Sequence, residues 1–133
     1  MKTKLLTIYL LLFTSQVLSW EFGVETADGG SKHYFDYKKI KTEGQYIFYW
    51  ELIDRISPHE NLKTLSQVNY WQADCNRMRA KTLLSINYKK NMAKGENLNI
   101  GPEFKDWTYP VPNSILDVHL SGFCDIKKKY YDK

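Results

Sequence analysis

The chain of 133 residues contains only two cysteines, Cys75 and Cys124, and only four prolines. After its first residues, no apolar run approaches the roughly 18 residues of a membrane-spanning helix. The motifs G-x-S-x-G, H-E-x-x-H, C-x-x-C, G-x-G-x-x-G and the P-loop are also absent. These absences exclude the hydrolase, zinc-protease, dithiol and nucleotide-binding families that those motifs define. We therefore expect no enzyme, no cofactor and no transmembrane segment in the mature chain.

The N-terminus has the pattern of an export signal. Two lysines precede the short apolar run "LLTIYLLLF", and Val17 and Ser19 are small residues at the positions that a signal peptidase reads. The pattern predicts that residues 1–19 are a signal peptide and that residues 20–133 form a single domain. We expect an exported protein, located in the periplasm, on the cell surface or outside the cell. An uncleaved N-terminal anchor is the alternative.

The excess of positive charge is small. The chain has 19 Lys and Arg against 15 Asp and Glu, and removal of Lys2 and Lys4 leaves 17 against 15, a net charge of +2. A dedicated nucleic-acid binder normally carries a strongly basic face, so we expect no nucleic-acid partner. Aromatic residues are abundant instead, with ten Tyr, six Phe and four Trp, and this composition favours β structure.

Five stretches have the alternation or the apolar content that predicts β-strands. They are residues 20–25, 31–37, 45–53, 67–75 and 77–88. The third of them is apolar on both faces, which is typical of a central strand covered on at least one side. Between the strands, we expect a basic connection at residues 38–44, and we expect a loop at residues 92–106.

The stretch 77–88 alternates between apolar and polar residues over its whole length. This period of two predicts a long, half-exposed strand. We expect one face of it to look outward and to carry the side chains of Arg77, Arg79, Lys81, Ser85 and Asn87.

The C-terminal part changes to a helical period. Ser114 is a candidate N-cap, with Asp117 three residues on. Apolar residues then recur on one stripe of a helix, namely Leu116, Leu120, Phe123 and Cys124. Several strands followed by one terminal helix predict an α+β fold.

The sequence allows Cys75 three roles: nucleophile, metal ligand or half of a disulfide. No catalytic signature surrounds Cys75, and the histidines that a zinc site would need are scattered along the chain. In an oxidising compartment, an even pair of cysteines in a small domain is usually a disulfide. Because Cys124 lies on the apolar stripe that packs on the sheet, we predict a Cys75–Cys124 disulfide and no metal site.

Candidate binding residues come from two basic stretches. "YFDYKKIK" interleaves aromatics with lysines, and the strand 77–88 keeps a polar face that must look outward. The residues we expect to bind are Lys38, Lys39, Lys41, Arg77, Arg79 and Lys81. The alternative is that these cations only keep the surface soluble, and we expect Asp74 to form an ion pair with Arg77 or Arg79.

The order of several motifs resembles a known family. A Trp near the mature start is followed by "YFDYKKIKTEGQYIFYWELID", then by "QADC" with a basic strand, and then by "PVPNS" before a helix with the second cysteine. This order is similar to that of the surface-adhesin protein E family of small exported bacterial domains, and it covers Trp20 to about Lys129.

The resemblance implies an antiparallel β-sheet with a C-terminal helix packed on one face and tethered by a disulfide. The family's cysteine pair falls on Cys75 and Cys124, and its Trp-bearing strand falls on Trp50. The implied role is adhesion, by binding host matrix or serum proteins without catalysis. Lipid-anchored adhesins of this kind carry a cysteine where this chain has Trp20, so we expect no lipid anchor.

We therefore expect a non-enzymatic exported binding domain, with a surface adhesin as the first interpretation. The expected partner is a protein or an anionic polymer, and a homodimer is a further possibility. The alternative is a periplasmic protein that binds or inhibits another envelope component. A small secreted hydrolase, built on acidic residues that the sequence does not single out, is the third interpretation.

Overall fold

The structure is a computed structural model that describes residues 18–100 and 106–133. The predicted signal peptide therefore lies outside the described residues, except for its last two. No helix in the described ranges is long and apolar enough to cross a membrane.

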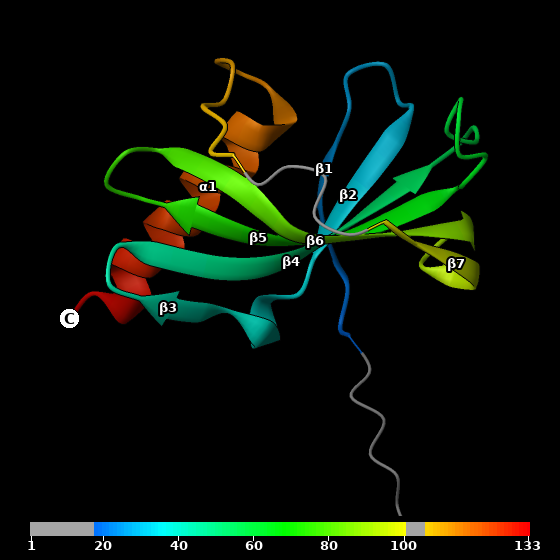
Figure 1. Cartoon of the computed structure of the whole chain (residues 1–133). Helices are drawn as coiled ribbons and strands as arrows, with labels where there is room; N and C mark the ends of the chain where they lie inside the picture. The colour runs from blue at the N-terminus through cyan, green and yellow to red at the C-terminus, as the bar shows by residue number, and fades with distance from the viewer. Residues whose placement is uncertain (1–17, 101–105) are drawn as a thin grey trace, which may run out of the picture.

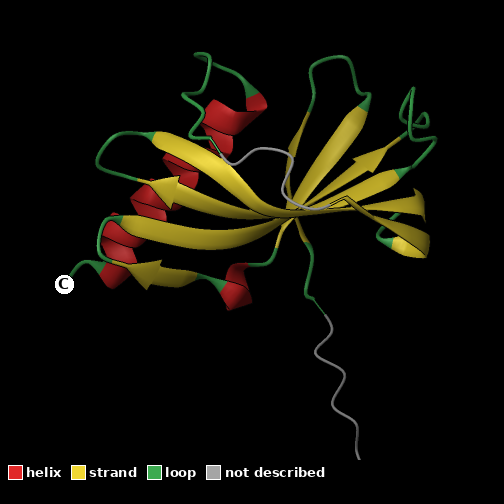
Figure 2. Ribbon diagram, viewed as in Figure 1, coloured by secondary structure: helices red, strands yellow, loops and turns green. Residues whose placement is uncertain are grey.

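Within the described residues, seven antiparallel strands form one open, strongly twisted sheet (Figure 1). The strands are β1 (Glu21–Glu25), β2 (Ser31–Phe35), β3 (Lys41–Glu43), β4 (Tyr46–Arg55), β5 (Ser66–Asp74), β6 (Arg79–Lys90) and β7 (Lys94–Ile100). Their order across the sheet is β1-β2-β4-β5-β6-β7, and β3 pairs with β4. One C-terminal helix lies against the sheet, so the predicted α+β class is confirmed (Figure 2).

β4 is the central strand that its two apolar faces predict. It pairs with β5 along its whole length, from Tyr46 opposite Asp74 to Asp54 opposite Ser66. On its other edge, the first residues of β4 pair with β3 and the last residues pair with β2. Two short strands therefore share one edge of β4, and the sheet bends away from a flat layer.

Helix α1 (Ile115–Ile126) covers only one half of one side of the sheet (Figure 1). The Ser114 hydroxyl accepts a hydrogen bond from the backbone N–H of Asp117 at 3.2 Å, which confirms Ser114 as the N-cap. The carboxylate of Asp117 accepts a bond from the backbone N–H of Asn113 at 2.8 Å. These two contacts fix where the helix begins.

The main core lies between α1 and this half of the sheet. Phe123 stacks on Tyr49 with ring centroids 3.7 Å apart, and Phe35 packs against both rings. Leu120 is fully buried beside them. The apolar stripe predicted for the helix is therefore the face that packs on the sheet, and burial of these large side chains is the main stabilisation of the fold.

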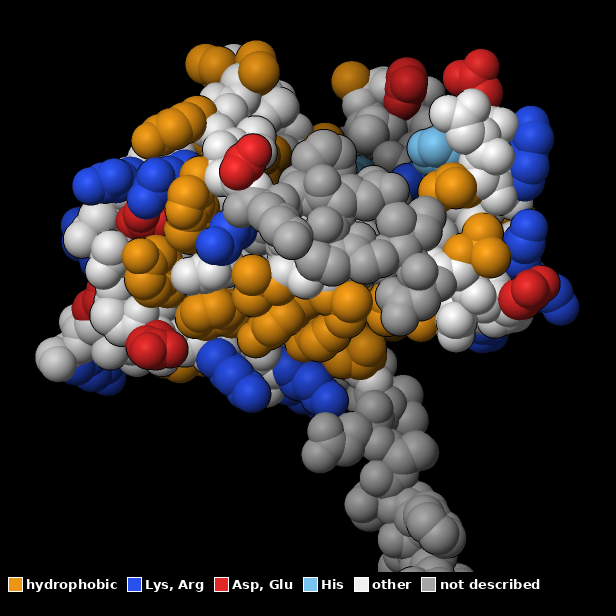
Figure 3. Space-filling view, in the orientation of Figure 1, with side chains coloured by type: hydrophobic (Ala, Val, Ile, Leu, Met, Phe, Trp, Pro, Cys, Tyr) orange, Lys and Arg blue, Asp and Glu red, His pale blue; other side chains and the backbone are white. Residues whose placement is uncertain are grey.

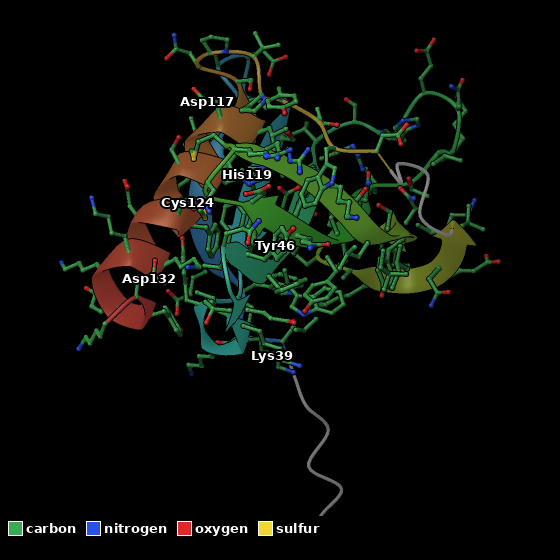
Figure 4. The ribbon with its side chains drawn as sticks, turned by 60° about the vertical axis from the view of Figure 1, so that its left-hand side comes forward. Lys39, Tyr46, Asp117, His119, Cys124 and Asp132 are labelled. Atoms are coloured by element: carbon green, nitrogen blue, oxygen red, sulfur yellow. A yellow bond between two sulfur atoms is a disulfide. The ribbon has the colours of Figure 1, made fainter. Side chains whose placement is uncertain are left out.

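A disulfide joins Cys75 and Cys124, whose Cα atoms lie 5.5 Å apart. Cys75 directly follows β5, and Cys124 lies on the side of α1 that faces the sheet (Figure 4). The predicted pairing is confirmed, and the bond ties the last turns of α1 to the middle of the chain. Among the described residues, no group of His, Cys, Asp or Glu side chains is arranged to hold a metal ion.

The predicted connections contain two strands that the sequence did not indicate. Residues 94–100, expected in a loop, form β7 and pair with β6, and residues 41–43, expected in a basic connection, form β3. Both are edge strands made of mainly polar residues, so they lack the alternation that marks a half-buried strand. Residues 101–105 of the expected loop lie outside the described residues.

The predicted outward face of β6 is wrong in its second half. Leu83 is an extra residue in β6, opposite the step from Tyr70 to Trp71 in β5. Such a β-bulge reverses the side-chain alternation along one strand. Ser85 and Asn87 therefore lie on the side of the sheet that faces α1, where they are buried, and not with the basic residues of the first half of the strand.

Candidate functional site

The side of the sheet opposite α1 carries a row of aromatic side chains. Tyr46, Phe48 and Trp50 alternate along β4 on this side, and Tyr70 projects from the neighbouring β5. Trp50 stacks on Tyr70 with centroids 4.5 Å apart, and Phe48 lies 6.2 Å from the same ring. Each of these four side chains is partly exposed, so each can contact both its neighbours and a partner.

A fifth aromatic side chain reaches this row from a distant segment. Trp107 precedes a single β-bridge between Thr108 and Ala80, which holds the segment against the edge of β6. The indole of Trp107 stacks on Tyr46 with centroids 5.9 Å apart. We call this set of five residues the aromatic face: Tyr46, Phe48, Trp50, Tyr70 and Trp107. Partial burial raises the pKa of Tyr70, so that ring stays uncharged at neutral pH.

Two shallow depressions lie on the aromatic face. One, of about 470 Å³, is lined by Trp50, Tyr70 and the lysines before β4. The second, of 260 Å³, is lined by Phe48, Tyr70 and the residues of β3. Tyr70 and Lys41 border both depressions, so together they form one uneven surface on which side chains of a partner could be seated.

Basic residues border the aromatic face on two sides. Lys38, Lys39 and Lys41 line the larger depression next to Trp50. At the other end, the cationic group of Lys81 lies 4.7 Å from the centre of the Trp107 ring. Figure 3 shows this side of the molecule as a band of hydrophobic side chains with lysine and arginine side chains next to it.

Arg79 has a structural role that the sequence indicated in part. Its Nε lies 3.1 Å from a carboxylate oxygen of Asp74, which is fully buried, and its guanidinium lies 4.4 Å from the centre of the Trp107 ring. The predicted Asp74 ion pair is therefore confirmed for Arg79. Arg77 is exposed and gives Asp74 only its backbone N–H, at 3.2 Å. Arg79 thus fixes the position of Trp107 on the aromatic face.

A buried polar group lies on the opposite side of the sheet. Glu51 of β4 has a His119 nitrogen 3.2 Å from one carboxylate oxygen and a His33 nitrogen 3.6 Å from the other. The Asn69 amide donates to Glu51 at 3.2 Å, and the Tyr49 hydroxyl lies 2.6 Å from the second nitrogen of His119. All five side chains are more than nine-tenths buried.

The surroundings set the charge of this group. Burial alone would raise the pKa of Glu51, but the adjacent imidazoles of His33 and His119 outweigh it, and the pKa of Glu51 is lowered. Burial lowers the pKa of His119, and Glu51 offsets only part of that effect. Burial and the charge of Glu51 raise the pKa of Tyr49 well above its ordinary value. At neutral pH, an ionised Glu51 therefore lies beside a neutral His119, whose Nδ1 accepts from the Tyr49 hydroxyl.

The burial of this group decides what chemistry it can do. Glu51 is 1% exposed and His119 is 5% exposed, so a substrate cannot reach either as an acid or a base without opening the core. A general acid or base must lie within hydrogen-bond reach of its substrate. This titratable cluster therefore connects α1 to the sheet, and it does not support the hydrolase interpretation.

The comparisons agree with this fold. The sequence model of the family described as surface-adhesin protein E matches residues 20–125. The chain belongs to the surface-adhesin protein E family. The family resemblance inferred from the motif order is thereby confirmed. The family is defined by an adhesin and not by an enzyme.

Solved structures of Haemophilus influenzae protein E are similar to this chain. Crystal form II of that protein has a TM-score of 0.59 and 13% identity, over 73% of this chain and 83% of that chain. A structure from non-typeable Haemophilus influenzae has a TM-score of 0.56 and 12% identity, over 84% and 88%. At this identity the likeness shows a shared fold alone. A search among curated proteins found no match.

Sequence reasoning located only part of this site. It singled out Lys38, Lys39 and Lys41 because aromatics and lysines alternate nearby, and these lysines do border the aromatic face. It did not place Trp107 there, because the contact with Tyr46 depends on a bridge between distant segments. The run "YIFYW" was the available signal, since Tyr46, Phe48 and Trp50 occupy alternate positions of a strand and must therefore lie on one side of it.

Proposed function

We propose that the chain is an exported, non-enzymatic adhesin that binds host matrix or other proteins through the aromatic face. The observation that supports this proposal is the aromatic face itself, a row of stacked, partly exposed rings on the side of the sheet opposite α1. Tyr and Trp are enriched among the residues that dominate protein–protein binding energy. Stacked rings also lose little conformational entropy when a partner covers them.

Within this proposal, the aromatic and basic residues have different roles. Trp50 and Tyr70 act as the anchors, because both line the larger depression and their rings are already stacked on each other. The cations at the borders attract an acidic partner and raise the rate of association. They are Lys38, Lys39, Lys41 and Lys81. Arg79 acts through Trp107, which it holds in place, and not as a direct contact.

The proposal is tested with a panel of purified matrix and serum proteins, measured by biolayer interferometry against the wild type and two variants. We expect Trp50→Ala to weaken binding by at least about tenfold, since a hot-spot side chain contributes roughly 2 kcal/mol. Tyr130→Ala removes another exposed ring at the C-terminal end of the chain, and we expect no change. Equal effects of both variants, or no binding to any protein of the panel, contradict the proposal.

The basic border is tested separately by charge reversal. We expect Lys41→Glu to slow association and to reduce its dependence on salt, because charges across an interface are screened over about 10 Å at 0.1 M salt. Lys128→Glu is the matched control, since Lys128 is exposed beyond the end of α1. An anionic polymer as the true partner would show a strong loss with Lys41→Glu and none with Trp50→Ala.

Location is tested by the protease accessibility of the protein on intact cells, with a periplasmic protein as control. Digestion on intact cells supports surface display and therefore adhesion. Protection until the outer membrane is broken contradicts adhesion and supports the alternative, in which the same aromatic face binds or inhibits an envelope component.

A further inference from the structure

A buried carboxylate lies where the end of the predicted signal peptide meets the sheet. Asp36 directly follows β2 and is only 1% exposed. Its Oδ2 accepts a hydrogen bond from the backbone N–H of Ser19 at 3.0 Å, and its Oδ1 accepts one from the backbone N–H of Lys38 at 3.0 Å. Both donors are neutral, and none of the ion pairs between described residues involves Asp36.

One of these two donors belongs to a residue that the mature chain is expected to lose. Val17 and Ser19 are the small residues that a signal peptidase reads, so cleavage is expected directly after Ser19. Cleavage removes the N–H of Ser19 and leaves one oxygen of the buried Asp36 carboxylate without its donor. Because an unpaired buried polar group costs free energy, the mature protein needs a donor in the same place.

The register of the sheet places the new N-terminus beside this carboxylate. In the pairing of β1 with β2, Glu21 lies opposite Phe35 and Phe22 lies opposite Tyr34. The same register, continued by one residue, puts Trp20 opposite Asp36. Residues that face each other in an antiparallel pair have Cα atoms roughly 5 Å apart. An amine on Trp20 therefore lies within reach of the Asp36 carboxylate.

We propose that signal-peptide cleavage supplies the missing donor: the α-ammonium of Trp20 forms an ion pair with Asp36 and anchors the mature N-terminus to the sheet. Hydrolysis of the Ser19–Trp20 bond consumes one water molecule. Ser19 leaves with the new carboxylate, and the amine that remains on Trp20 takes up a proton at neutral pH. A hydrogen bond between an ammonium and a carboxylate is roughly twice as strong as one between neutral groups, so the new contact is stronger than the one it replaces.

The same carboxylate connects the N-terminus to the basic border of the aromatic face. Asp36 is the N-cap of η1 (Tyr37–Lys39), a single turn of 3₁₀ helix, through its bond from Lys38. The lysines of this turn line the larger depression of the aromatic face. Removal of the signal peptide thereby completes the support of a turn that borders the binding surface. The proposal rests on the export signal and on no residue of the aromatic face, so it fails independently of adhesion.

The ionisable side chains on the adjoining segments leave Asp36 as the partner of the new amine. Glu21 of β1 is exposed, and Glu51 of β4 lies on the side of the sheet that faces α1. In η1, burial and the charge of Glu21 raise the pKa of Tyr37, so its phenol is neutral where an α-amine titrates. Lys38 and Lys39 carry the same positive charge as the amine and cannot pair with it.

The test is the titration of the α-amine in the protein purified after export. Intact mass first shows whether the chain begins at Trp20. Reaction of the amine with acetic anhydride is then followed by mass spectrometry of the N-terminal peptide, from about pH 6 to about pH 10, since an ordinary α-amine titrates near pH 8. We expect a midpoint about 1–2 pH units higher in the folded protein than in the same protein unfolded in urea, because an adjacent carboxylate favours the charged form.

Two variants assign the shift to the proposed pair. Asp36→Asn keeps a side chain that caps a helical turn well but removes the charge, so the midpoint should return to that of the unfolded protein. Asp125→Asn removes an exposed carboxylate of α1 and should leave the raised midpoint unchanged. Thermal unfolding gives a second measurement. A pKa raised in the folded state stabilises fully below about pH 8 and less as the pH rises through it, so the melting temperature should fall more steeply toward pH 10 in the wild type than in Asp36→Asn.

Three results would overturn the proposal. The first is a mature chain that retains Ser19, and the second is an equal midpoint in the folded and the unfolded wild type. The third is a raised midpoint that persists in a folded Asp36→Asn variant, which would assign the shift to another carboxylate such as Glu21. If Asp36→Asn does not fold, the comparison of folded with unfolded wild type still decides.

Discussion

Removal of the disulfide is expected to cost a large part of the stability of this domain. The two cysteines are 49 residues apart in sequence, and a cross-link that closes a loop of that size lowers the entropy of the unfolded chain by about 14 cal/mol/K. At room temperature this corresponds to about 4 kcal/mol, against the roughly 5–15 kcal/mol by which a domain is usually stable. Replacement of both Cys75 and Cys124 by alanine should therefore leave a marginally stable protein.

The assay is urea unfolding followed by tryptophan fluorescence, with the free energy of unfolding extrapolated to water. Without the cross-link the unfolded chain is more expanded, so we expect a steeper dependence on urea as well as a lower midpoint. The wild type under reducing conditions should lose about the same free energy as the double variant. A loss below about 1 kcal/mol in both would refute the reasoning, because it would mean that the cross-link does not constrain the unfolded chain.

Two glycines and one histidine give further predictions. A Cβ at Gly23 would lie 2.5 Å from the Phe35 ring, so Gly23→Ala should destabilise the protein by about 1–3 kcal/mol. At Gly122 of α1, an added Cβ would have nothing within 4 Å, so Gly122→Ala should stabilise the protein by up to about 1 kcal/mol. The free energy of unfolding of each variant is measured in urea, and a change of the same sign in both variants would contradict the packing described for the two glycines. Because burial lowers the pKa of His119, the unfolded chain takes up a proton below about pH 6.5 before the folded protein does. The free energy of unfolding should therefore fall from pH 7 to pH 5, by at most about 1.4 kcal/mol per pH unit for this proton, and His119→Gln should flatten the slope. An unchanged slope in that variant would show that His119 titrates alike in both states.

Local patterns in the sequence were enough for the elements whose residues carry the signal themselves. The N-cap at Ser114, the apolar stripe that contains Phe123 and the alternating aromatics of β4 each depend on neighbouring residues, and each is confirmed. The disulfide followed from the same stripe together with the compartment that the N-terminus indicates. Physical regularity along a short stretch is sufficient for inferences of this kind.

The features that the sequence did not predict depend on pairing between distant segments. The bulge at Leu83 changes which side of the sheet Ser85 faces, but alternation alone assumes a constant register. β7 is a mainly polar edge strand that pairs with β6, so its own residues carry little pattern. The contact of Trp107 with Tyr46, which completes the aromatic face, likewise exists only after the chain has folded.

The central claim is that the aromatic face is the surface that binds proteins. It is tested most directly by amide hydrogen exchange. Exchange is compared between the free protein and its complex with a matrix or serum protein that it binds in the interferometry experiment. We expect new protection along residues 46–50, around Tyr70 and in the turn at residues 37–39, with exchange in α1 unchanged. Protection confined to the outer face of α1, or spread along the edge strand β7, would contradict the claim and move the binding surface elsewhere on the fold.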